Sequence, residues 1–172
     1  AIKAYNKSIS LTPDYADPYI NMGNILSNQG DLDEAIEFYK KAVLLKPDYV
    51  EAYNNIGVAL REQGKIEESI EAYNKCIFLN PNHAEAYNNM GMALQYKGKF
   101  DNAIDAYDKA ISLKPDYAQA HQNLSYTLLN SNRLQEGFDE YEWRWKTDKF
   151  LSQQRHFLQP IWDGKTNLNG KR

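Results

Sequence analysis

The chain of 172 residues has little cysteine, no long apolar run and little net charge. Its one cysteine, Cys76, can form no internal disulfide bond, and we interpret the setting as cytoplasmic. No apolar run approaches the roughly 20 residues that a membrane-spanning helix needs. Acidic and basic residues are interspersed and the net charge is −3, so the basic stripe typical of nucleic-acid binding is absent. We therefore expect partners other than membranes or nucleic acid.

Prolines recur in the chain with a fixed period. Pro13, Pro47, Pro81 and Pro115 each lie 34 residues after the one before. Glycines and tyrosines repeat with the same offset: Gly23, Gly57 and Gly91; Gly30, Gly64 and Gly98; Tyr19, Tyr53 and Tyr87; Tyr39, Tyr73 and Tyr107. A fixed period of this length indicates a solenoid of stacked structural repeats.

Each repeat is predicted to contain two helices. In the second unit one helical face has the i, i+3, i+4, i+7 spacing, at Tyr53, Ile56, Gly57 and Leu60. A second helical stripe follows at Ile66, Ser69, Ile70, Tyr73, Cys76, Ile77 and Leu79. Gly64 and Pro81 are expected to end the two helices. Each unit is thus predicted to be a helical hairpin.

Small residues mark the expected crossing between the two helices of a unit. Gly57 and Ser69 have this role in the second unit, and Ala35 and Ala103 correspond to Ser69 in its neighbours. Side chains this small let two helix backbones approach closely. The tyrosines are expected to fill the wider gaps.

The stretch EAYNNIGVALREQGKIEESIEAYNKCIFLNP resembles the tetratricopeptide repeat family in its order of aromatic, small and proline residues. The resemblance implies an all-α fold, a right-handed solenoid of antiparallel helix pairs with four repeats, a preceding half repeat and an aromatic C-terminal cap. The expected units are residues 1–13 (the second helix of an earlier repeat), 14–47, 48–81, 82–115, 116–148 and 149–172 (a capping tail and linker toward a further domain). Since the chain starts halfway through a unit, we expect it to be a piece of a larger protein.

The fourth repeat departs from the pattern of the others. His121 takes the place of a tyrosine, Ser125 and Asn132 take the places of glycines, and Gly137 takes the place of an alanine. Terminal repeats are expected to be atypical, because one of their faces has no neighbour to pack on.

The family resemblance implies that the first helices line a concave groove suited to extended ligands. Asn21, Asn55, Asn89 and Asn123 form one column on that face. An asparagine amide can pair with both the C=O and the N–H of a peptide unit. The column is similar to the one with which the tetratricopeptide superhelix of O-linked N-acetylglucosamine transferases holds substrate polypeptides. The alternative is that asparagine is a polar groove residue in this family whatever the partner.

The candidate peptide-binding residues occupy the inner positions of the first helices: Asn21, Asn24, Asn54, Asn55, Val58, Asn88, Asn89, Met92, Gln122, Asn123 and Tyr126. A neighbouring column leans acidic, at Asp17, Glu51, Glu85 and Gln119. We therefore expect a protein or peptide partner that is neutral to mildly basic.

Chaperone-binding members of the family clamp a C-terminal carboxylate with basic residues at set groove positions. Those positions are here Ile20, Asn24, Asn55, Glu85 and Asn89. Because the basic residues are absent and Glu85 would repel a carboxylate, such a clamp is not expected.

The sequence offers little catalytic chemistry. His83, His121 and His156 have no metal-ligand spacing, and we interpret each as structural. Cys76 stands where neighbouring repeats have alanine, which indicates a small buried side chain. Glycine-rich phosphate loops and convergent carboxylate pairs are absent. We therefore expect no catalytic residue, metal site, cofactor or small-molecule substrate in this chain, and we do not interpret it as an enzyme.

The repeat pattern ends in large aromatic residues. From Leu134 onward, the last helix is expected to present Phe138, Tyr141 and Trp145 on one side and Trp143 on another. Because the open end of a solenoid exposes an apolar face, these aromatics are expected to cover it. The tail is expected to fold back as a cap through Phe157, Ile161 and Trp162.

The tail also resembles the approach to a further domain. Its segments QPIWDG and LNGKR form a W-x-G then L-x-G-K pattern at Trp162, Gly164, Leu168, Gly170 and Lys171. A similar pattern is found in bacterial proteins in which tetratricopeptide repeats precede a glycosyltransferase-like domain of the GT-B type. The resemblance implies a region that recruits substrates or partners for such a domain. The alternative is an assembly scaffold that docks subunits through the solenoid ends or the convex face.

Overall fold

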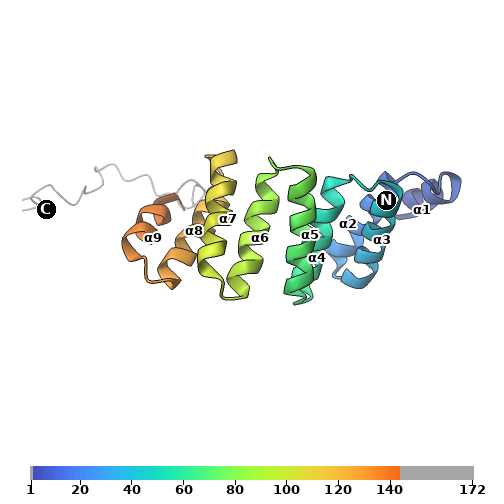
Figure 1. Cartoon of the computed structure of the whole chain (residues 1–172). Helices are drawn as coiled ribbons and strands as arrows, with labels where there is room; N and C mark the ends of the chain where they lie inside the picture. Colours follow the sequence, from blue (N-terminus) through green and yellow to red (C-terminus); the bar gives the residue numbers. More distant parts are fainter. Residues whose placement is uncertain (1, 144–172) are drawn as a thin grey trace, which may run out of the picture.

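The computed structural model of the chain describes residues 2–143, and this part is all-α, as expected. The helices are α1 (Ile2–Leu11), α2 (Asp17–Gln29), α3 (Leu32–Leu45), α4 (Val50–Glu62), α5 (Ile66–Leu79), α6 (Ala84–Tyr96), α7 (Phe100–Leu113), α8 (Ala118–Asn130) and α9 (Leu134–Tyr141). They follow one another along a single axis, with α1 at one end and α9 at the other (Figure 1).

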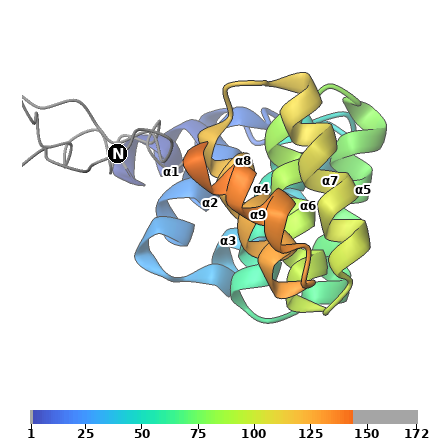
Figure 2. The same cartoon turned by 90° about the vertical axis from the view of Figure 1, so that its left-hand side faces the viewer.

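The helices pack as antiparallel pairs that stack side by side. The pairs are α2 with α3, α4 with α5, α6 with α7, and α8 with α9. Contacts between pairs also join the first helices to each other, α2 to α4, α4 to α6 and α6 to α8, whereas no two second helices of the described chain approach each other as closely. Figure 2 looks along the stack with α8 and α9 in front. Since only the first helices approach one another, α2, α4, α6 and α8 lie on the inside of the curve.

A left-handed residue turns the chain between the two helices of each pair. Gly30, Gly64 and Gly98 have φ of 89°, 77° and 72°. At the same place in the last pair, Asn132 has φ of 64°. Asparagine is one of the few residues with a side chain that tolerates this conformation. The departure from glycine in the fourth repeat therefore keeps the turn.

The close crossing within each pair is confirmed at the glycines. A Cβ atom added to Gly57 would lie 2.5 Å from Cε1 of Tyr73. The same contact recurs between Gly23 and Tyr39 and between Gly91 and Tyr107. The expectation that the tyrosines fill wider gaps is wrong, because each ring lies directly against the glycine at the crossing. Glycine is needed there to make room for the ring.

His121 keeps a contact that a tyrosine makes elsewhere. The hydroxyl of Tyr19 donates to the carbonyl of Pro13 at 3.0 Å, and Nε2 of His121 lies 3.0 Å from the carbonyl of Pro115. A carbonyl only accepts, so Nε2 carries the proton of this bond. The other ring nitrogen, Nδ1, contacts the carboxylate of Glu140 on α9. The buried histidine thereby joins α8 to the last helix.

The aromatic end differs from the expected one. Helix α9 ends at Tyr141, and one short turn of 3₁₀ helix follows at Glu142 and Trp143. Trp143, which the pattern placed on another side, stacks on His121 with ring centroids 3.7 Å apart. Phe138 is 58% exposed in the described structure, so the expectation that it covers the end is wrong there. Trp145, Phe157, Ile161 and Trp162 lie outside the described residues.

Candidate peptide-binding groove

The candidate residues lie on the four inner helices. Asn21 and Asn24 come from α2, Asn54, Asn55 and Val58 from α4, Asn88, Asn89 and Met92 from α6, and Gln122, Asn123 and Tyr126 from α8. Most are half-buried. Asn88 is the most enclosed, at 2% exposure, whereas Tyr126 is 43% exposed. The structure thus brings the predicted residues onto one set of adjacent helices, with Asn88 beneath the surface rather than on it.

The asparagines hydrogen-bond to each other across the repeats. The amide Nδ2 of one helix donates to the Oδ1 of an asparagine on the preceding inner helix. The pairs are Asn55 to Asn24 at 2.9 Å, Asn89 to Asn54 at 3.1 Å, and Asn123 to Asn88 at 2.9 Å. We call this set the asparagine ladder. It fixes the orientation of each donating amide, a feature that spacing in the sequence did not reveal.

The ladder leaves binding capacity at its central members. An asparagine amide has two N–H donors and an acceptor oxygen. Asn55 and Asn89 each use one N–H in the ladder and keep a second N–H and the Oδ1 atom. At the ends the situation differs, since Asn24 accepts a second bond from Tyr39 at 2.8 Å and Asn123 accepts one from Gln119 at 3.1 Å. The middle of the groove therefore offers the more complete donor and acceptor pairs.

The acidic column is only partly available to a ligand. Asp17 accepts hydrogen bonds from the hydroxyls of Tyr15 and Tyr49. These two bonds lower the pKa of the Asp17 carboxyl, while burial and the bond to Asp17 raise the pKa of Tyr49 to about 12. Glu51 and Glu85, the next two members, are exposed. The free negative charge of this column thus lies along α4 and α6.

A cation outside the candidate set lies among these residues. Arg61 on α4 is half-buried, and its Nη1 lies 3.2 Å from the Sδ atom of Met92 on α6. It stands one turn after Val58 on the same helix, so the helical spacing of the groove positions includes it on the inner face. Its contact with Met92 joins two inner helices.

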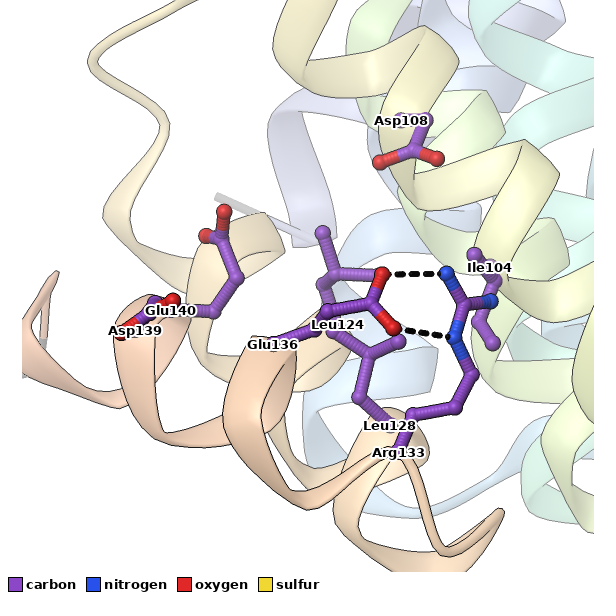
Figure 3. A pocket seen from close by; sticks show the side chains of 8 residues that line it. All are labelled: Ile104, Asp108, Leu124, Leu128, Arg133, Glu136, Asp139 and Glu140. Atoms are coloured by element: carbon purple, nitrogen blue, oxygen red, sulfur yellow. Dashed lines mark hydrogen bonds and ion pairs between the residues drawn. The ribbon is translucent and has the colours of Figure 1, made fainter.

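Two hollows lie away from the groove, between the second helices of adjacent repeats. One of about 230 Å³ is lined by Ile104, Asp108, Leu124, Leu128, Arg133, Glu136, Asp139 and Glu140 (Figure 3). In it Arg133 holds the carboxylate of Glu136 with two hydrogen bonds. Burial, helped by the charge of Glu140, raises the pKa of Asp108. The other, of about 360 Å³, lies one period earlier and has Ile70, Met90 and Leu94 in its lining.

The side chains of Cys76 and His83 lie in surroundings that indicate structural roles. Cys76 is buried, and burial raises the pKa of its thiol to about 11. His83 caps α6, where Nδ1 accepts from the backbone N–H of Ala86 at 3.2 Å. Within residues 2–143, His, Cys, Asp and Glu form no group that could hold a metal ion, and no helix is long and apolar enough to cross a membrane. His156 lies outside the described residues.

Family models agree with the helix pairs. A TPR repeat model matches residues 23–64, and two tetratricopeptide repeat models match residues 50–83 and 84–117, and residues 4–37 and 106–138. Together these matches run from residue 4 to residue 138. The chain is a tetratricopeptide repeat protein. No curated protein sequence matches it.

Solved structures of MamA resemble most of the chain. A crystal structure of MamA is 27% identical to this chain, with a TM-score of 0.78, and covers 89% of this chain and 90% of its own. A second MamA structure is 28% identical, with a TM-score of 0.75 and coverage of 93% and 87%. MamA from Desulfovibrio magneticus RS-1, from residue 41 onward, is 21% identical with a TM-score of 0.73 over 89% and 85%, and shows the fold alone. The repeats and these neighbours support a protein-interaction module.

Proposed function

We propose that the inner groove binds an extended polypeptide through the asparagine ladder. The observation that carries this proposal is the free N–H and Oδ1 of Asn55 and Asn89, which the ladder holds in fixed orientations. These groups match the C=O and N–H of a peptide backbone. Fixing them before binding reduces the ordering cost that a ligand must overcome.

The spacing of the inner helices suits this mode of binding. Packed helices lie about 8–10 Å apart, and an extended chain advances about 3.3 Å per residue, so the ladder meets roughly every third residue. Each neutral hydrogen bond contributes about 0.5–1.5 kcal/mol. After ordering costs, the expected affinity is on the order of micromolar and tolerant of sequence.

The charge of the groove limits the net charge of the segment that it can bind. Glu51 and Glu85 expose carboxylates beside the ladder. A segment that is neutral or mildly basic overall avoids repulsion from them. A nucleic-acid backbone, by contrast, would need a row of cations, whereas the acidic residues of this chain outnumber its basic residues.

From the sequence of the tail alone, we infer that a further domain follows the solenoid. The pattern at Trp162, Gly164, Leu168, Gly170 and Lys171 supports a glycosyltransferase-like domain after this solenoid, for which the groove would recruit substrates or partners. These residues lie outside the described structure. Reading the coding sequence beyond Arg172 tests this inference, which predicts alternating strands and helices there and is abandoned if more repeats follow instead.

The binding proposal is tested with two matched double variants. Asn55→Ala with Asn89→Ala removes two ladder donors, whereas Asn74→Ala with Asn102→Ala removes two exposed amides from the outer helices α5 and α7. We expect the inner pair to weaken binding of blocked, neutral peptides of about ten residues by at least about ten-fold. The outer pair should leave binding unchanged.

Thermal melts accompany both variants, because the inner pair also breaks two ladder bonds and should lower stability by about 1 kcal/mol for each. Equal binding by folded inner and outer variants would contradict the proposal. It would favour a scaffold that docks subunits through its convex face.

A further inference from the structure

The buried tyrosines of the second helices differ in what their hydroxyls contact. Tyr39 donates to Oδ1 of Asn24 at 2.8 Å, and Tyr107 donates to Oε1 of Gln95 at 3.1 Å. Tyr73, the equivalent residue between them, is fully buried and its hydroxyl has no hydrogen-bond partner. An unpaired buried hydroxyl costs free energy, so its retention in one repeat needs a reason.

The cause lies on helix α4. The residue 34 positions after Asn24 is Val58, and the residue 34 positions before Gln95 is Arg61. Valine has no polar atom, and arginine has donors but no acceptor. In the repeat at residues 48–81, the two positions that supply an acceptor in a neighbouring repeat are therefore a valine and an arginine.

The guanidinium of Arg61 also lacks strong hydrogen-bond acceptors. Its Nη1 contacts only the thioether of Met92, a weak acceptor, and its Nε is buried without a partner. It makes no ion pair with any residue in the described part of the chain. Burial raises the pKa of Tyr73, and the charge of Arg61 opposes that rise. The helix pair α4 and α5 thus holds two unsatisfied donors, one of them a cation.

We propose that Arg61 binds the carboxylate of an aspartate or glutamate side chain in the bound polypeptide. A guanidinium pairs with carboxylates through short, charge-assisted hydrogen bonds, which are stronger than those between neutral groups. A side chain fits better than a chain terminus, because the ladder continues on both sides of Arg61, from Asn24 to Asn123. The inference rests on the proposed function and adds one acidic position to a segment that is otherwise neutral or mildly basic.

The test compares peptides that differ in one group. The probes are labelled peptides of about ten residues, built from glycine, serine and alanine, with blocked termini and one central glutamate or glutamine. The unmodified protein should bind the glutamate peptide about ten-fold more tightly. A glutamine peptide with a free C-terminal carboxylate should bind no better than the blocked one.

Two variants of Arg61 complete the test. Arg61→Gln gives α4 the acceptor that Gln95 supplies to Tyr107, so this variant should bind both peptides equally and unfold at a higher temperature. Arg61→Lys keeps the charge and should retain part of the preference for glutamate. These opposite effects on specificity and stability separate a binding role from a structural one.

Different failures have different meanings. Equal binding of both peptides by the unmodified protein, or a glutamate preference that survives in Arg61→Gln, overturns this inference while leaving the groove proposal in place. Stronger binding of the free C-terminus than of the glutamate peptide overturns the side-chain assignment. If neither peptide binds, the proposed function itself fails, and the inference with it.

Discussion

At the scale of single residues, the solenoid depends on tyrosine rings that lie against glycines on the partner helix. Tyr39, Tyr73 and Tyr107 are at most 2% exposed, and each ring passes through the space where a glycine has no side chain. Protein interiors are packed densely enough that one added methyl group is felt. The hydroxyl of Tyr39 also donates to the groove residue Asn24, so this tyrosine links the packing of its helix pair to the binding face.

The first prediction concerns this contact. Gly57→Ala should lower the free energy of unfolding by about 1–3 kcal/mol, because the new methyl group would overlap a ring that cannot move away. The matched control is Gly64→Asn, which should cost less than about 1 kcal/mol, since Asn132 already adopts the equivalent left-handed turn. Chemical denaturation measures both values. Equal losses in the two variants would show that the ring contact is not what requires glycine at residue 57.

The second prediction concerns Cys76. Only the thiolate reacts with iodoacetamide, and burial both blocks access and raises the pKa of this thiol to about 11. At pH 8 the folded protein should therefore resist alkylation, and the protein in denaturant should react fully. Mass spectrometry reads the added mass. Rapid modification of the folded protein would contradict the buried position of this residue.

At the scale of elements, the last helix is attached differently from the others. Helix α9 has only Gly137 buried, yet Glu140 reaches the buried His121 and Trp143 stacks on the same ring. The contact between the buried ring of His121 and the carboxylate of Glu140 should stabilise the protein more than an exposed ion pair does. The end of the described solenoid is thus held by a polar contact where earlier repeats have tyrosine.

The third prediction tests that attachment. Glu140→Ala should destabilise α9 by about 1–3 kcal/mol and speed hydrogen exchange of its backbone amides, because His121 loses the partner of Nδ1. Glu136→Ala is the control: its carboxylate pairs with Arg133 at the surface, where such pairs contribute less than about 1 kcal/mol. The account of this helix is wrong if both variants exchange at the same rate.

Much of this architecture could be predicted from the sequence. The period of glycines and prolines fixes where helices begin and end, and helical spacing identifies the inner face, because both are properties of neighbouring residues. The exposure of Phe138 and the missing acceptor of Tyr73 could not be predicted, since each depends on contacts with another helix. The ladder could be predicted in part. Its asparagines form a column that the sequence period reveals, but the hydrogen-bond partner of each donating asparagine lies on the preceding repeat.

At the scale of the whole molecule, the repeats form one continuous inner surface. Each helix pair contacts only its neighbours, so the stability of the stack is approximately a sum of repeat and interface contributions. The ladder crosses three of these interfaces with side-chain hydrogen bonds. A ligand that bridges the same asparagines would span several repeats and stabilise the stack by binding only the folded form.

The fourth prediction tests the central claim, that the groove asparagines contact an extended polypeptide. The measurement is the nuclear magnetic resonance titration of asparagine side-chain amides in nitrogen-labelled protein with a blocked peptide of about ten residues. We predict that the amides of Asn55 and Asn89 shift with added peptide, while those of Asn74 and Asn102 on the outer helices stay constant. Shifts at Asn74 and Asn102 with none at Asn55 and Asn89 would place the ligand on the convex face and contradict the account.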